Sequence, residues 1–144
     1  MQDRFEKITQ YLVVPLKGDA RERTVACEYF RKEKDEWIAV SGNDLRSHKK
    51  DILCITQPPY EEAVKRVPTV DPCLHLFAGV AKTRDTSRSM PNLMQVIDGA
   101  IIVAVYPNTS RSLILIFQRF TNDKEFGELV ATTDPDVKND PDAC

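Results

Sequence analysis

Apolar residues near the start of the chain recur at helical spacing. Phe5, Ile8 and Leu12 stand at positions i, i+3 and i+7, which is typical of one face of an amphipathic helix. We therefore predict a helix over residues 3–13, ended by Pro15.

The next apolar positions alternate with polar ones, as in half-buried strands. Val25, Cys27 and Tyr29 alternate within residues 23–31, and a second apolar run follows at 36–40. This pattern predicts a hairpin of two strands joined at residues 32–35. A single helix over residues 19–36 is the alternative, but β-branched and aromatic residues favour the hairpin.

The sequence pattern in the middle of the chain predicts two strands and two helices. Residues 52–57 form a β-rich run that Pro58 ends, and Pro59 then suits the first turn of a helix over 60–67. A mostly apolar strand is expected at 73–82. A second short helix is expected at 89–98, with Ser89 as its N-cap.

Two β-rich runs at 100–106 and 112–120 give the clearest pattern in the chain. Residues 107–111 separate them, which predicts a hairpin with a five-residue loop at the centre of a sheet. A last helix is expected over 122–131, capped by Thr121.

These elements predict an α+β fold. We expect a single domain over residues 1–132, with a mainly antiparallel sheet of about five or six strands and helices packed chiefly on one face. Residues 133–144 are rich in aspartate and proline, and an acidic, disordered C-terminal tail is expected there.

Composition and charge narrow the class of protein. The chain has 144 residues, of which 42% are apolar and 29% are charged, as is ordinary for a globular domain. Residues 134–144 sum to a charge of −3, which leaves +1 for residues 1–133. A nearly neutral body has no general attraction to nucleic acid or to anionic lipid.

The sequence also bears on location and redox state. It holds no apolar run of the roughly 18 residues that cross a bilayer, and its charged start does not resemble a secretory signal. We predict a cytoplasmic protein with no membrane association. Cys27, Cys54 and Cys73 have apolar neighbours and are expected to be reduced core residues, whereas Cys144 ends the acidic tail.

One segment has the chemistry of an anion site. Residues 82–89 gather cations and hydroxyl groups just before a predicted helix N-terminus, where backbone N–H groups favour phosphate. The candidate ligand-binding residues are Lys82, Arg84, Arg88, Ser89 and Arg111. Their hypothetical ligand is a nucleotide or another small phosphorylated molecule.

Signatures of catalysis are sparse. The two histidines, His48 and His75, and the scattered cysteines lack the short spacing of zinc sites, and none of the common local catalytic motifs occurs. We predict no metal, no cofactor and no catalytic residue. A small hydrolase or transferase that uses Cys73 or His75 stays a third hypothesis.

The first functional hypothesis is a small non-enzymatic binding or adaptor protein that acts through protein–protein contacts. The N-terminal helix is expected to pack on the sheet of its own chain, and its exchange into a second copy, which would give a homodimer, is the alternative. The second is the binder of a phosphorylated ligand, and the charge balance argues against nucleic acid as a partner.

Overall fold

The computed structural model describes residues 8–18, 24–42, 45–47, 52–83, 94–97, 99–104, 110–120, 126–132 and 136–139. Regular structure in these ranges is almost entirely strand. The strands are β1 (Ile8–Pro15), β2 (Cys27–Glu33), β3 (Glu36–Val40), β4 (Leu45–Ser47), β5 (Ile52–Thr56), β6 (Leu74–Thr83), β7 (Met94–Ile97), β8 (Ala100–Ala104), β9 (Ser110–Phe120), β10 (Phe126–Ala131) and β11 (Asp136–Asn139). One helix among the described residues, α1 (Tyr60–Arg66), connects β5 to β6.

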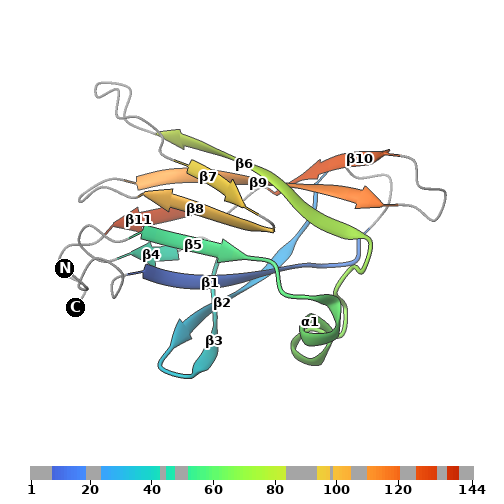
Figure 1. Cartoon of the computed structure of the whole chain (residues 1–144), viewed down its shortest axis with the longest axis horizontal. Helices are drawn as coiled ribbons and strands as arrows, with labels where there is room; N and C mark the ends of the chain where they lie inside the picture. Colours follow the sequence, from blue (N-terminus) through green and yellow to red (C-terminus); the bar gives the residue numbers. More distant parts are fainter. Residues whose placement is uncertain are drawn as a thin grey trace.

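The strands form two sheets that pack face to face as a β-sandwich (Figure 1). The first sheet has the order β3-β2-β1-β5-β8-β7. In the second sheet β9 is central, with β6 on one edge and β10 and β11 on the other, and β4 extends the sheet beyond β11. Neighbouring strands are antiparallel except for β1 with β5 and β4 with β11, which are parallel.

The core lies between the two sheets. Inward-facing apolar side chains of both sheets form one buried cluster, and each large member contributes about 1.5–3 kcal/mol when fully buried. Its members are Tyr11, Val13, Val25, Tyr29, Leu53, Ile55 and Ile101 from the first sheet and adjoining chain, and Leu45, Leu74, Leu76, Leu113, Leu115, Phe117 and Val130 from the second sheet.

The predicted α+β class is therefore wrong. The domain is mostly β, and its core is closed by a second sheet rather than by helices on one face of a single sheet. The one helix of the described chain has seven residues. It covers a small part of the outer face of the first sheet, where Ala63 and Val67 pack with Val14.

The helix predicted over residues 3–13 is strand β1 in its described part. This strand is covered on both faces, because Val13 lies in the main core and Val14 packs under α1. A strand that is buried on both faces shows a continuous apolar run rather than alternation, and such a run does not distinguish strand from helix. The predicted route to a homodimer by helix exchange loses its basis.

Two further predicted helices are strands in their described parts. Met94–Ile97 forms β7, which pairs with β8 through a two-residue connection in which Gly99 has φ +78°. Asp98-Gly99 is a hairpin signal, although the predicted helix ended at Asp98. Phe126–Ala131 forms β10, where Val130 is buried and Leu129 is exposed, as strand periodicity requires.

The predicted central hairpin is wrong in its pairing, although both of its segments contain strands. β8 pairs with β5 and β7, whereas β9 pairs with β6, β10 and β11. The chain crosses from one sheet to the other between these strands. The short connection between β8 and β9 is compatible with either a hairpin or a crossing to the other sheet. The strands with which β8 and β9 pair, which are distant in the sequence, decide between the two.

Other predictions are confirmed. The hairpin of β2 and β3 is present, with Glu33 opposite Glu36 across the turn at Lys34 and Asp35, and the alternative helix over 19–36 is wrong in its described part. Strands β5 and β6 and helix α1 also lie where the sequence predicts them. Glu61 and Glu62 in the first turn and basic residues in the last turn suit the dipole of α1.

The remaining expectations concern the tail, the cysteines and the membrane. Asp136–Asn139, within the expected disordered tail, forms β11 beside β9 and β4. Cys27 and Cys54 are only partly buried and Cys73 is exposed, so the expectation that all three are core residues is wrong. Cys144 lies outside the described residues. No helix in the described ranges is long and apolar enough to span a membrane.

Candidate functional site

A pocket of about 380 Å³ opens at the end of the sandwich where α1 lies, and we call it the α1 pocket. Both sheets, the helix and the segments that flank it contribute to its wall. The lining residues are Val13, Pro15, Gln57, Pro58, Pro59, Tyr60, Ala63, Val70, Asp71, Pro72, Leu74, His75, Leu76 and Gly99. Residues of both sheets therefore meet at this pocket.

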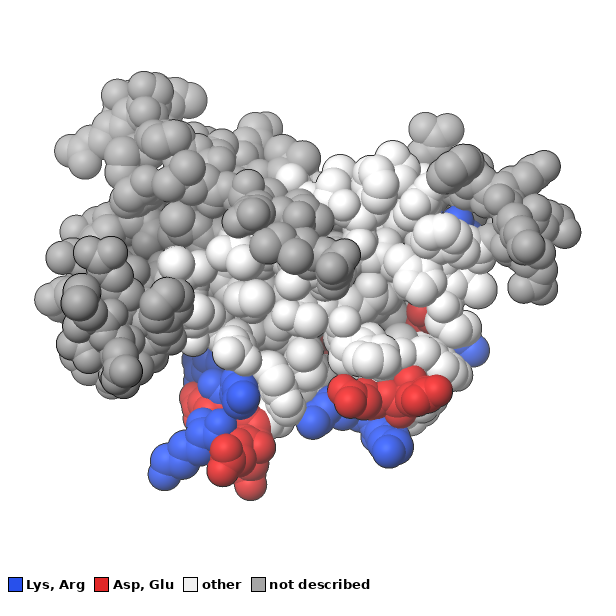
Figure 2. All heavy atoms as spheres, viewed as in Figure 1, with Lys and Arg blue, Asp and Glu red and all other residues white. Residues whose placement is uncertain are grey.

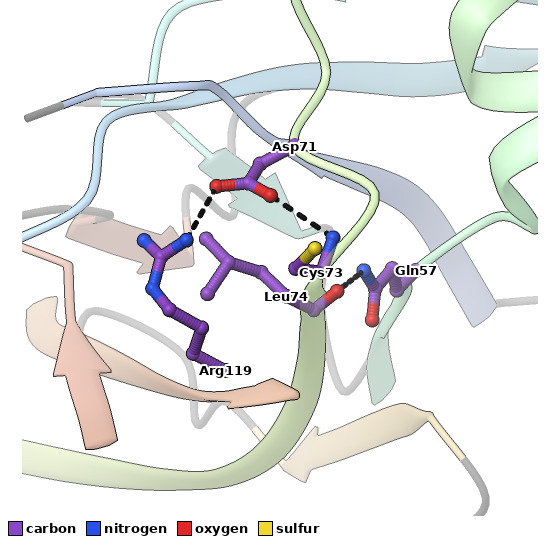
Figure 3. Close-up of polar contacts among 5 residues, drawn as sticks. All are labelled: Gln57, Asp71, Cys73, Leu74 and Arg119. Carbon is purple, nitrogen blue, oxygen red and sulfur yellow. Dashed lines mark hydrogen bonds and ion pairs between the residues drawn. The ribbon is translucent and has the colours of Figure 1, made fainter. Parts of the chain in front are cut away.

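The side chain of Gln57 bridges the two sheets at this pocket. Gln57 follows β5 of the first sheet, and its amide nitrogen donates to the carbonyl oxygen of Leu74 in β6 at 2.7 Å (Figure 3). Its amide oxygen accepts from the backbone N–H of Leu76, also at 2.7 Å. One side chain thus pairs with the edge of β6 much as a residue of a neighbouring strand would.

Asp71 is the buried acid of the pocket wall. One carboxylate oxygen accepts from the backbone N–H of Cys73 at 2.9 Å, and the other lies 3.1 Å from Nη1 of Arg119 (Figure 3). The backbone N–H of Asp71 donates to the carbonyl oxygen of Pro15. Both the charge and the hydrogen-bonding capacity of Asp71 are therefore engaged within the protein.

Two aromatic residues of the pocket lining are exposed. Tyr60, the first residue of α1, is 47% exposed. His75 is also exposed, and its ring meets that of Phe120 edge to face with 4.8 Å between the centroids. His75 therefore faces away from the side of Leu74 and Leu76, which are buried.

His75 also belongs to an exposed apolar surface on the outer face of the second sheet. We call this surface the outer patch and define it as His75, Phe77, Phe120 and Leu129. The last three are 54%, 44% and 51% exposed. The register places His75 opposite Gln118, which lies opposite Leu129 on the next strand, so the patch spans three adjacent strands about 5 Å apart.

Charged side chains gather elsewhere on the face of the molecule that Figure 2 shows. There they lie mainly over the β2–β3 hairpin and α1, while the other described surface is mostly uncharged. Ion pairing reduces the net effect of such charges, as between Arg31 and Glu33. The described surface thus carries local groups of charged side chains rather than a large region with charge of one sign.

The predicted anion site is only partly within the described residues. Lys82 lies opposite Ser112, and Thr83 lies opposite Arg111, so β6 and β9 bring these backbone segments together. Arg84, Arg88 and Ser89 lie outside the described residues. The helix expected to follow them is strand β7 over Met94–Ile97, which removes that part of the argument. The phosphate site stays a prediction.

Among the candidate residues for catalysis and metal binding, Cys73 and His75 make contacts within the protein. The backbone of Cys73 donates to Asp71, and His75 contacts Phe120. Within the described ranges, no group of three or more His, Cys, Asp or Glu residues is placed to hold a metal ion. The use of Cys73 or His75 in a hydrolase or transferase stays a hypothesis.

Sequence reasoning missed Gln57, Asp71 and Arg119. Arg119 had a readable signal, because it follows Leu113, Leu115 and Phe117 at alternate positions, which all point inward. A cation in an inward register requires a buried partner. No local pattern identifies Asp71 as that partner, because 48 residues separate the two.

Comparison with known proteins finds little similarity. No protein family matches the sequence, and no curated protein matches it. Among solved structures, the chain is distantly similar to the PixA inclusion body protein of Burkholderia cenocepacia, with 10% sequence identity. The match covers 92% of this chain and 94% of that one, with a TM-score of 0.46. These comparisons show no specific function.

Proposed function

We propose that this protein is a non-enzymatic binding protein that holds a protein partner against the outer patch. The observation that carries this proposal is the exposure of Phe77, Phe120 and Leu129 on three adjacent strands. Single exposed apolar residues are normal, but a contiguous group on one face is typical of interaction surfaces. Burial of these side chains is the driving force for docking.

The surroundings of the patch favour an apolar contact. Ile116, which is half-buried, lies opposite Ala78 on one side and Ala131 on the other. These residues lie on the same face as Leu129 and extend the uncharged surface, and Phe77 lies at the irregularity of the register between Leu76 and Ala78. Two aromatic rings at the centre of such a contact would act as its anchors, because aromatic residues dominate the binding energy of many interfaces.

The first partner to test is a second copy of the chain. A two-fold axis through the outer face would bring one patch against the same patch of the partner. Size-exclusion chromatography with light scattering would then give a dimer mass, and Phe120→Asp would give a monomer. A monomer mass for the unchanged protein would exclude self-association and leave a different protein as the partner.

Site-specific photo-cross-linking in cells that natively produce the protein tests the docking face itself. A benzoylphenylalanine at position 77 should cross-link to a partner protein, and Leu129→Asp on the same face should reduce that product. The matched control is the same label at Ile38, which is 39% exposed on β3 of the other sheet. Equal products from both positions, or no product from position 77, would overturn the proposal.

A further inference from the structure

We propose that the α1 pocket binds a small uncharged organic molecule with an aromatic or aliphatic body. Its volume of about 380 Å³ lies near the lower end of the roughly 300–1,000 Å³ of small-molecule sites. This site goes beyond the docking of a protein partner, because the pocket enters the end of the sandwich whereas the outer patch covers one sheet. Of the residues that define the patch, only His75 also lines the pocket.

The wall of the pocket is already formed. Val13 and Leu74 come from the packed core and are 0% and 1% exposed. Pro58, Pro59 and Pro72 restrict the segments on either side of α1. A ligand would therefore enter without the cost of ordering loops, which is the main advantage of a preorganised site.

The small side chain of Ala63 keeps the space open. It is 2% exposed on the buried side of α1, and it lines the pocket together with Val70. Because Ala63 also packs with Val14 and Val67, a longer side chain there must displace these neighbours or enter the pocket. Ala63 and Val70 back the pocket but expose almost no surface. The body of a ligand would therefore be buried mainly against Pro59, Pro72 and the ring of Tyr60, which are exposed in the lining.

The polar groups of the wall argue for a ligand without charge. The carboxylate of Asp71 is paired with Arg119 and accepts from Cys73, and the amide of Gln57 is engaged by β6. His75, the basic residue of the lining, is exposed and its ring lies against Phe120. A charged ligand in the interior of the pocket would therefore lose water without gaining a counter-charge there, which is costly. Tyr60 at the exposed end can contact a ring and offers a hydroxyl group for one hydrogen bond.

Three probes that share one ring system test the proposal: indole, which is neutral, indole-3-acetate, which is an anion, and tryptamine, which is a cation. The full-length protein is titrated with each probe, and methyl resonances of Ala63 and Val70 are followed by NMR. Indole should shift these methyl groups with a dissociation constant on the order of 1 mM. The methyl groups of Val130 in the core should not shift. Both charged probes should bind about tenfold more weakly or worse.

Substitutions of residues that line the α1 pocket test whether indole binds there. Tyr60→Ala, at an exposed position that tolerates change, should weaken indole binding about fivefold, and Ala63→Leu should abolish it. The matched control is Phe77→Ala, which removes an exposed aromatic ring of the outer patch and should leave indole binding unchanged. Leu129→Asp, which should reduce partner cross-linking from position 77, should likewise leave indole binding unchanged, so the pocket and the docking face fail or succeed independently.

Three results would overturn the inference. The first is no shift of the Ala63 and Val70 methyl groups at indole concentrations well above 1 mM. The second is tighter binding of tryptamine or indole-3-acetate than of indole, which would show that a charge in the wall is available. The third is unchanged indole affinity in folded Tyr60→Ala and Ala63→Leu proteins.

Discussion

Asp71 and Arg119 form an ion pair that ties the segment after α1 to the end of β9, with 3.1 Å between Oδ2 and Nη1. The Asp71 side chain is 8% exposed and that of Arg119 is 27% exposed. Such a pair, with a further hydrogen bond from Cys73 to the carboxylate, is held in one geometry. Loss of either partner leaves the other poorly solvated.

We expect Asp71→Ala to lower the free energy of unfolding by about 2–3 kcal/mol, because it removes an ion pair and a backbone hydrogen bond together. A double-mutant cycle with Arg119→Ala, measured by urea unfolding, should give a coupling energy of about 1 kcal/mol. The same cycle on the more exposed pair of Arg31 and Glu33 should give less than about 0.5 kcal/mol. Additive effects at Asp71 and Arg119 would contradict this description of the site.

Gln57 gives the second prediction, because its amide makes both bonds to β6. Gln57→Ala should lower the free energy of unfolding by about 2 kcal/mol, at about 1 kcal/mol for each hydrogen bond. Gln57→Glu should not restore stability, because a carboxylate oxygen would then face the carbonyl oxygen of Leu74. Gln10→Ala, at an exposed position on β1, is the control and should be nearly neutral. A fully stable Gln57→Glu protein would refute the bridging role.

The sequence predicts those elements whose local pattern and tertiary environment agree. In β6, Leu74 and Leu76 are buried and His75 is exposed, so alternation identifies the strand. Helix α1 follows Pro59 and begins with acidic residues, which are local start signals. The β2–β3 hairpin needs only neighbouring residues and a short turn.

Other elements depend on distant parts of the chain. β1 is covered by the core on one face and by α1 on the other, so its apolar residues show no period of two. β10 becomes a strand because one edge of β9 is available to pair with it, and such pairing overrides weak local propensity. The layering of two sheets follows from these pairings, which no local pattern encodes.

The residues of the candidate site likewise divide into those that a local pattern indicates and those that depend on distant parts of the chain. Arg119 stands in an inward register that alternation reveals, and this favours an acidic partner nearby. Its partner Asp71 and the bridging residue Gln57 occupy connections between elements. The residues of the pocket come together only because both sheets end beside α1.

Thr132 provides a third prediction, because its buried hydroxyl oxygen accepts from the N–H of Leu115 at 2.9 Å. Thr132→Val keeps the shape of the side chain but leaves this N–H without its partner, so the free energy of unfolding should fall by about 1–3 kcal/mol. Amide exchange at Leu115 should become faster. Thr132→Ser retains the hydroxyl group and should preserve slow exchange at Leu115. Equal exchange rates in the Val and Ser variants would contradict this role.

The last prediction concerns the turn between β2 and β3, where Lys34 has φ 55°. A side chain disfavours this left-handed conformation because its Cβ approaches the following carbonyl oxygen. Lys34→Gly removes that strain, although glycine also gains freedom in the unfolded chain. The net effect should be an increase of about 0.5–1 kcal/mol in the free energy of unfolding, measured by urea denaturation. Asp35→Gly, at the neighbouring position without a positive φ, should instead be neutral or destabilising. A less stable Lys34→Gly protein would show that the Lys34 side chain stabilises the hairpin by more than its backbone strain costs.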